Sequence, residues 1–135
     1  MYNLAKSLYV ELLGSAELTT LLGGAFIYNP VPPKGTALPW VAFSFSSGEE
    51  GNVTPSQNWT ASYLVKGVAA TLKLAEQIAD ELYATLQHAT LMTAGMTNYL
   101  TRRTTIVSYE EYGPGGEMLA AHCGGIYRVD LEVTG

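Results

Sequence analysis

The stretch TLKLAEQIADELYATLQ, residues 71–87, predicts the long helix around which this chain folds. Its apolar residues recur at steps of three and four, which places them on one stripe of an α-helix. The stripe consists of Leu72, Ala75, Ile78, Ala79, Leu82 and Leu86. An amphipathic helix is held in place mainly by burial of its apolar face, so this helix needs a layer to pack against.

Alternating residues predict the strands of that layer. Two strands precede the helix, at residues 39–46 and 58–68, and two follow it, at 98–109 and 123–133. The last strand alternates most regularly, with Tyr127, Val129, Leu131 and Val133 on one side and Arg128, Asp130 and Glu132 on the other. It therefore has one buried face and one face that is exposed to solvent or to a partner. On the third strand the alternation predicts that Arg103, Thr105, Val107 and Tyr109 share one side.

The N-terminal part predicts helices and a connector. A first helix is expected at residues 2–13, with Gly14 as its stop and Ser15 as the N-cap of a short turn at 16–22. Residues 25–38 contain Pro30, Pro32 and Pro33, and proline removes a backbone donor. We therefore expect an extended connector there and not a central strand.

Two segments rich in turn-forming residues are expected to be hairpin loops. Residues 47–57 predict a mobile or partner-ordered loop, and residues 110–121, which include the run Gly113-Pro114-Gly115-Gly116, predict a flexible hairpin tip. Both segments carry acidic residues, namely Glu49, Glu50, Glu110, Glu111 and Glu117.

Together the elements predict an α+β fold in the order α-β-β-α-β-β, formed by a single domain over residues 1–135. We expect a small antiparallel sheet of about four strands with two helices packed on one face. The other face and the strand edges stay uncovered, and such surfaces usually meet a neighbour.

The composition points to protein partners. Charged residues make up 14% of the chain, well below the roughly 25% of soluble domains. Nine Tyr and two Trp accompany these few charges, and protein interfaces are enriched in both aromatic types. We therefore expect part of the surface to be covered by other protein chains.

The charge argues against nucleic acid as a direct partner. The net charge is −5, and a phosphate backbone is bound through clustered Lys and Arg. Only Arg102 and Arg103 adjoin, and neighbouring strand residues point to opposite faces. An acidic protein is still able to line a route along which DNA passes. The first residues predict neither a signal peptide nor a membrane span, and we expect synthesis in the cytoplasm.

The residues able to carry chemistry form no convincing catalytic or metal site. Cys123 is the single cysteine, which excludes an intrachain disulfide, and it faces away from its neighbour His122. His88 has no ligand spacing to either residue. The acidic pairs lie on presumed loops, whereas catalytic carboxylates need fixed geometry. We expect no catalytic residue, no metal and no cofactor; the alternative is a small enzyme or ligand-binding domain that uses Cys123, His122 and Tyr127.

Several segments resemble one family in order along nearly the whole chain. These are Leu21-Leu22-Gly23-Gly24 with Ile27-Tyr28, the run Gly35-Thr36-Ala37-Leu38-Pro39-Trp40-Val41-Ala42-Phe43, the apolar stripe of the long helix, and Gly124-Gly125-Ile126-Tyr127-Arg128-Val129. In this order and spacing the chain resembles the tail terminator or tail completion proteins of long-tailed bacteriophages. The segment from Ser46 to Asn58 is long for that family.

The resemblance implies a structural, non-enzymatic virion protein of the tail and neck. It implies a homo-oligomeric ring, commonly a hexamer, that caps the tail tube and joins it to the head–neck connector. Its partners would be copies of itself, the major tail tube protein and the neck proteins, with DNA only as cargo and no membrane. The alternative within the same virion is a head–tail adaptor. Our candidate interface residues are Glu49, Glu50, Trp59, Arg102, Arg103, Glu110, Glu111, Glu117 and Arg128.

Overall fold

The computed structural model describes residues 2–53, 56–87, 89, 91 and 96–133, with side chains described over 4–47, 59–87, 89, 91 and 100–132. Within these residues the helices are α1 (Tyr2–Leu13), α2 (Ala16–Leu22) and α3 (Leu72–Leu86), and the strands are β1 (Ile27–Tyr28), β2 (Trp40–Val53), β3 (Ser56–Ala69), β4 (Met96–Tyr112) and β5 (Met118–Val133). The chain has the predicted α+β class.

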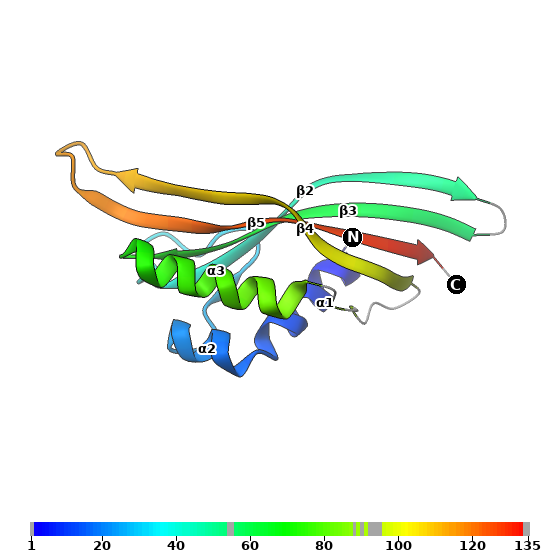
Figure 1. Cartoon of the computed structure of the whole chain (residues 1–135), viewed down its shortest axis with the longest axis horizontal. Helices are drawn as coiled ribbons and strands as arrows, with labels where there is room; N and C mark the ends of the chain where they lie inside the picture. The colour runs from blue at the N-terminus through cyan, green and yellow to red at the C-terminus, as the bar shows by residue number, and fades with distance from the viewer. Residues whose placement is uncertain (1, 54–55, 88, 90, 92–95, 134–135) are drawn as a thin grey trace.

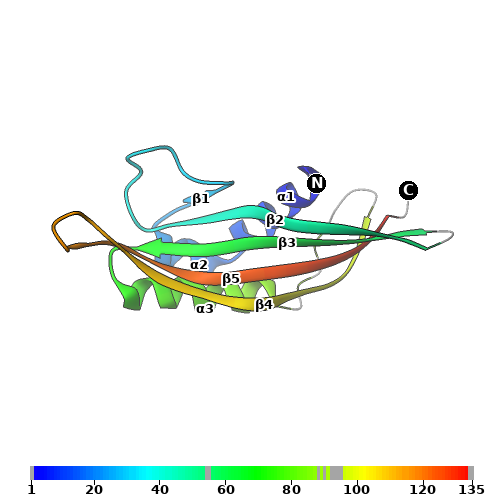
Figure 2. The ribbon, with the colours of Figure 1, turned by 90° about the horizontal axis from the view of Figure 1, so that it is seen from above.

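The five strands form one sheet in the order β1-β2-β3-β5-β4. All neighbours pair antiparallel except β1, which runs parallel to β2. The three helices lie together on one face of the sheet, as predicted for the helical layer (Figure 1). Seen from above, the strands form a long twisted band with α3 beneath it (Figure 2).

Short capping interactions fix where the helices begin and end. The Leu18 amide donates to Ser15 Oγ at 3.2 Å, and the Leu74 amide donates to Thr71 Oγ1 at the same distance. Each hydroxyl satisfies one of the free amides of a first helical turn. Gly23 ends α2 with φ at 78°, a left-handed conformation that glycine adopts readily.

The core forms between the helical layer and the covered face of the sheet. The predicted stripe of α3 is buried at Ala75, Ile78, Leu82 and Leu86. From the sheet side, the core receives Val41, Phe43, Ala61, Tyr63, Val65, Tyr127, Val129 and Leu131. α1 adds Leu4, Leu8 and Leu12 to this core.

Gly67 sets how closely α3 approaches the sheet. A Cβ atom at this position would lie 2.3 Å from Ile78 Cγ2. The absence of a side chain on β3 therefore lets Ile78 reach the sheet backbone. Gly124 lies on the neighbouring strand, where an added Cβ would meet the backbone carbonyl oxygen of Val65 at 2.1 Å.

Both predicted hairpin loops are wrong in extent. β2 and β3 stay paired out to Val53 and Ser56, so most of the expected loop at 47–57 is strand. β4 continues to Tyr112 and β5 begins at Met118, which leaves a turn of only residues 113–117. Ser, Gly and Glu have low strand propensity, but pairing with an already ordered neighbour overrides that preference.

Three further details differ from the expectations. The connector at 25–38 contains the two-residue strand β1, which pairs with Val41 and Ala42, and the short turn at 16–22 is a third helix. In β4 the predicted side of Arg103, Thr105, Val107 and Tyr109 is wrong. The register shifts between Arg103, opposite Tyr127, and Thr105, opposite Ile126, so the residues after this bulge change faces.

We expect Gly67→Ala to destabilise the fold by about 1–3 kcal/mol because the new methyl group overpacks the contact with Ile78. Ile78→Ala alone should cost about 2–5 kcal/mol through the cavity it leaves. Urea unfolding of the double variant should show a cost smaller than the sum of the two. The matched control is Gly124→Ala combined with Ile78→Ala, which should show no such relief; additive costs at Gly67 and Ile78 would contradict the proposed spacing role.

Candidate functional site

The uncovered face of the sheet and two projecting hairpin ends form the candidate site. At one end of the molecule β2 and β3 extend beyond the helices, and at the other end β4 and β5 do so (Figure 1). We call residues 47–53 and 56–60 the β2–β3 arm and residues 109–119 the β4–β5 arm. The sheet therefore presents long strand segments that no helix covers.

Two strand edges have no neighbouring strand among the described residues. β4 is the last strand on one side of the sheet. On the other side β1 pairs only with Val41 and Ala42, so the rest of β2 lies at the sheet edge. Unpaired edges offer backbone donors and acceptors to an added strand.

The uncovered face near the β4–β5 arm carries a packed polar cluster. The His122 ring stacks on Tyr109 with centroids 4.4 Å apart, and Lys66 Nζ donates to the Tyr109 hydroxyl at 2.8 Å. His122 Nε2 lies 2.9 Å from Glu111 Oε1, and His122 is 6% exposed. These contacts tie three neighbouring strands together where the arm leaves the body of the sheet.

The central part of the same face carries a second cluster. Arg128 Nε donates to Asp130 Oδ1 at 2.9 Å, and Thr60 Oγ1 donates to the same oxygen at 3.2 Å. This ion pair therefore forms along one strand, between residues on the same face of β5. Arg102 is exposed and lies opposite Arg128 in the β4–β5 register. Two arginines therefore sit side by side on an open surface.

Arg103 lies on the helical side, as the alternation with Arg102 predicted. Its guanidinium lies 4.2 Å from the centre of the Tyr83 ring, and its backbone amide donates to Gln87 Oε1 at 2.9 Å. Tyr127 lies opposite in the register and is 1% exposed. Burial raises the pKa of Tyr127 to about 12, while the Arg103 charge acts in the opposite direction.

The remaining predicted interface residues are placed separately. Glu110 and Glu117 are exposed on the β4–β5 arm, where the Tyr112 hydroxyl donates to Glu110 and this bond raises the Tyr112 pKa. Trp59 is half-buried against the core, and its Nε1 has no hydrogen-bond partner within the described residues. Glu49 and Glu50 lie in β2 opposite Thr60 and Trp59, and their side chains fall outside the description. The candidates therefore do not form one cluster.

The residues weighed for chemistry are kept apart by the sheet. Cys123 is buried and lies 3.5 Å from Ser108 Oγ, whereas His122 packs on the uncovered face. The run from Gly113 to Gly116 forms a turn closed by a 2.8 Å bond from the Gly113 amide to the Glu117 carbonyl. His88 lies outside the described residues. Over the described part of the chain, no group of three His, Cys, Asp or Glu side chains is placed to hold a metal ion.

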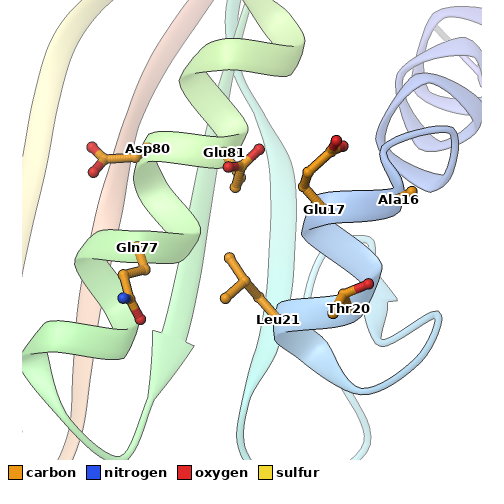
Figure 3. A pocket seen from close by; sticks show the side chains of 7 residues that line it. All are labelled: Ala16, Glu17, Thr20, Leu21, Gln77, Asp80 and Glu81. Carbon is orange, nitrogen blue, oxygen red and sulfur yellow. The ribbon is translucent and has the colours of Figure 1, made fainter.

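Sequence reasoning missed two grooves in the helical layer. One, of about 540 Å³, lies between α2 and α3. Glu17 and Leu21 face Glu81 across it, while Asp80 points away from α2 (Figure 3). The other, of about 420 Å³, lies between α1 and the strands β1 and β2. No helix in the described part of the chain has the length and apolar character needed to cross a bilayer.

Comparisons with known proteins agree with this architecture. A solved structure described as the virion of a native gene transfer agent particle contains a chain of the same fold, with a TM-score of 0.75 at 17% identity over 98% of this chain and 99% of that one. The structure of the bacteriophage SPP1 gp17 protein matches with a TM-score of 0.50 at 18% identity over 99% and 93%. Among curated proteins no relative matches.

The chain thus shares its α+β fold with a chain of a gene transfer agent particle and with a bacteriophage protein. The model of the family described as tail completion protein gp17 matches residues 6–111, and the chain belongs to that family. It is a structural virion protein with a role in completing the tail, which confirms the predicted family and class of function.

We expect Tyr127→Phe to change stability by less than about 1 kcal/mol at pH 7, because the hydroxyl has no hydrogen-bond partner within the described residues. The folded-state pKa of about 12 lies above the ordinary value of 10.0. Below pH 10 both states keep the proton. Between pH 10 and 12 the unfolded chain loses it first, so Tyr127 lowers stability by up to about 1.4 kcal/mol per pH unit.

Urea unfolding at pH 7 and at pH 11 measures this difference. The Phe variant should lose less stability than the parent chain between the two values. Phe43→Leu, a core substitution that removes no titrating group, is the control and should leave the pH dependence unchanged. Equal losses in the parent chain and the Tyr127→Phe variant would contradict the assignment.

Proposed function

We propose that this chain, acting as one domain over residues 1–135, is the subunit of a ring that terminates the tail tube and joins it to the head–neck connector. Its mechanism is assembly and not catalysis. The observation that carries the proposal is the pair of arms at opposite ends of one sheet, together with two strand edges that have no neighbouring strand among the described residues. A ring built from one chain needs two different surfaces that complement each other.

The two edges support a contact by strand addition. β4 offers an edge at one side, and the outer part of β2 offers an edge at the other. Strand addition gives affinity through main-chain hydrogen bonds and specificity through the flanking side chains. The exposed Arg102, next to Arg128, lies beside such an edge and is suited to a contact with acidic groups of a neighbour.

The family membership supports the tail as the location, and the major tail tube protein and the neck proteins are the partners we propose. The copy number we propose is six. DNA passes through the lumen as cargo without a binding site, in keeping with the net charge of −5. The second candidate is an adaptor on the portal side of the same neck, which the family description also allows.

Sedimentation and native mass spectrometry of the purified chain, alone and with tail tubes, test the ring. We expect a closed oligomer of defined mass, in solution or on the tube. Purified tubes should be capped by the chain at one end, which electron microscopy of the mixture would record. A preference for portal assemblies over tubes would favour the adaptor. A mass of one chain, both alone and with tail tubes, would contradict the proposed ring.

Arg102→Glu should weaken self-association by about tenfold, because it reverses a charge at the proposed contact without touching the core. Lys73→Glu is the matched control, since Lys73 is exposed on α3. Both variants should keep the thermal midpoint of the parent chain. Equal self-association of the two variants would show that Arg102 does not contribute to the interface.

A further inference from the structure

The groove beside α1 is an apolar surface with a positive rim. Its lining includes Tyr9 and Leu13 of α1, together with Ile27 of β1 and Phe43 of β2. Val10 at its edge is 61% exposed, and Lys6 contributes the one charge among the lining residues. An exposed apolar surface next to a charge is typical of a protein contact.

The β4–β5 arm has the complementary character. Tyr112, Met118 and Leu119 are exposed on it by 58%, 36% and 47%. Its only charged residues are Glu110, Glu111 and Glu117, so residues 109–119 carry three negative charges and no positive one. The β4–β5 arm thus combines exposed apolar side chains with a net negative charge.

Charge decides between the two grooves of the helical layer. The α2–α3 groove is lined by Glu17, Asp80 and Glu81 and by no basic residue, so it repels the acidic β4–β5 arm. The α1 groove has no acidic residue in its lining and carries Lys6. Bringing like charges together at an interface costs free energy. Of these two grooves, the α1 groove therefore suits the β4–β5 arm better.

The β4–β5 arm that fills the α1 groove belongs to a second copy of the chain. Both views place the β4–β5 turn at the left end of the molecule and α1 to the right of the centre (Figures 1 and 2). The strands that carry the turn are held by the sheet, so the arm points away from its own α1. A contact between different surfaces of two copies is head-to-tail, which is the kind that closes rings.

We propose that the tip of the β4–β5 arm inserts into the α1 groove of the next subunit, with Leu119 and Met118 near Val10 and Glu117 near Lys6. This inference rests on the proposed ring and names its interlocking contact. It assigns a receptor to the arm and gives α1 a second role beyond the core.

Disulfide trapping tests the contact directly. The chain carrying Val10→Cys and Leu119→Cys should form interchain disulfides under mild oxidation and run as a ladder of multimers on a non-reducing gel. Cys123 is buried and is retained. Glu81→Cys with Leu119→Cys is the control, because it places the partner thiol on the rejected groove, and it should remain mainly a single chain.

A charge exchange provides the second measurement. Lys6→Glu and Glu117→Lys should each weaken self-association by about tenfold, since each places like charges together. The double variant should recover to within about threefold of the parent chain, because the pair is restored with reversed sign.

The outcomes separate this inference from the proposed function. Rings that form while the Val10 and Leu119 thiols cross-link no better than the control overturn the groove contact and leave the ring intact. A chain that stays single alone and with tail tubes overturns both. Cross-linking together with charge rescue supports the contact, and cross-linking of the Glu81 control at an equal rate contradicts it.

Discussion

The close contact between α3 and β3 is the constraint on which the rest of the structure depends. Ile78 rests against Gly67, where a Cβ would come within 2.3 Å of its Cγ2. The contact brings α3 onto the two central strands, and the core between them is dry because Ala75, Leu82 and Leu86 follow on the same stripe. With β3 and β5 anchored in this way, the strands can extend past the helices and remain ordered.

This division of the sheet relates the fold to its role in the virion. The middle of each long strand packs against the helices, and in the proposed ring its ends make the contacts with other chains. On the uncovered face the polar groups pair with one another, as Glu111 does with His122 and Arg128 with Asp130. Such internal pairing orients the exposed side chains before a partner arrives, which lowers the ordering cost of association.

The sequence predicted the parts of the fold that depend on local pattern. The apolar stripe at 71–87, the cap at Ser15 and the alternation of residues 123–133 each have a period or a cap that only one element satisfies. The lengths of the arms could not be predicted, because residues such as Ser47 and Gly51 have low strand propensity and are ordered by pairing with Ser62 and Asn58 on the opposite strand. The bulge after Arg103 could not be predicted either, because it is defined by the pairing of β4 with β5. The interface candidates named from charge are proposals still, and the two grooves carry no sequence signal because each combines residues from separate elements.

The register shifts in β4 have a consequence for the chain before it enters a particle. The ladder with β5 is interrupted between Asn98 and Leu100, between Arg103 and Thr105, and between Glu111 and Tyr112. Each interruption bends the strand, so a straight foreign strand finds no long regular edge to copy. An outermost strand of 17 residues would otherwise template aggregation while subunits accumulate in the host cell. Irregular spacing thus limits indiscriminate pairing at the β4 edge, which in the proposed ring accepts a neighbour whose strand follows the same bends.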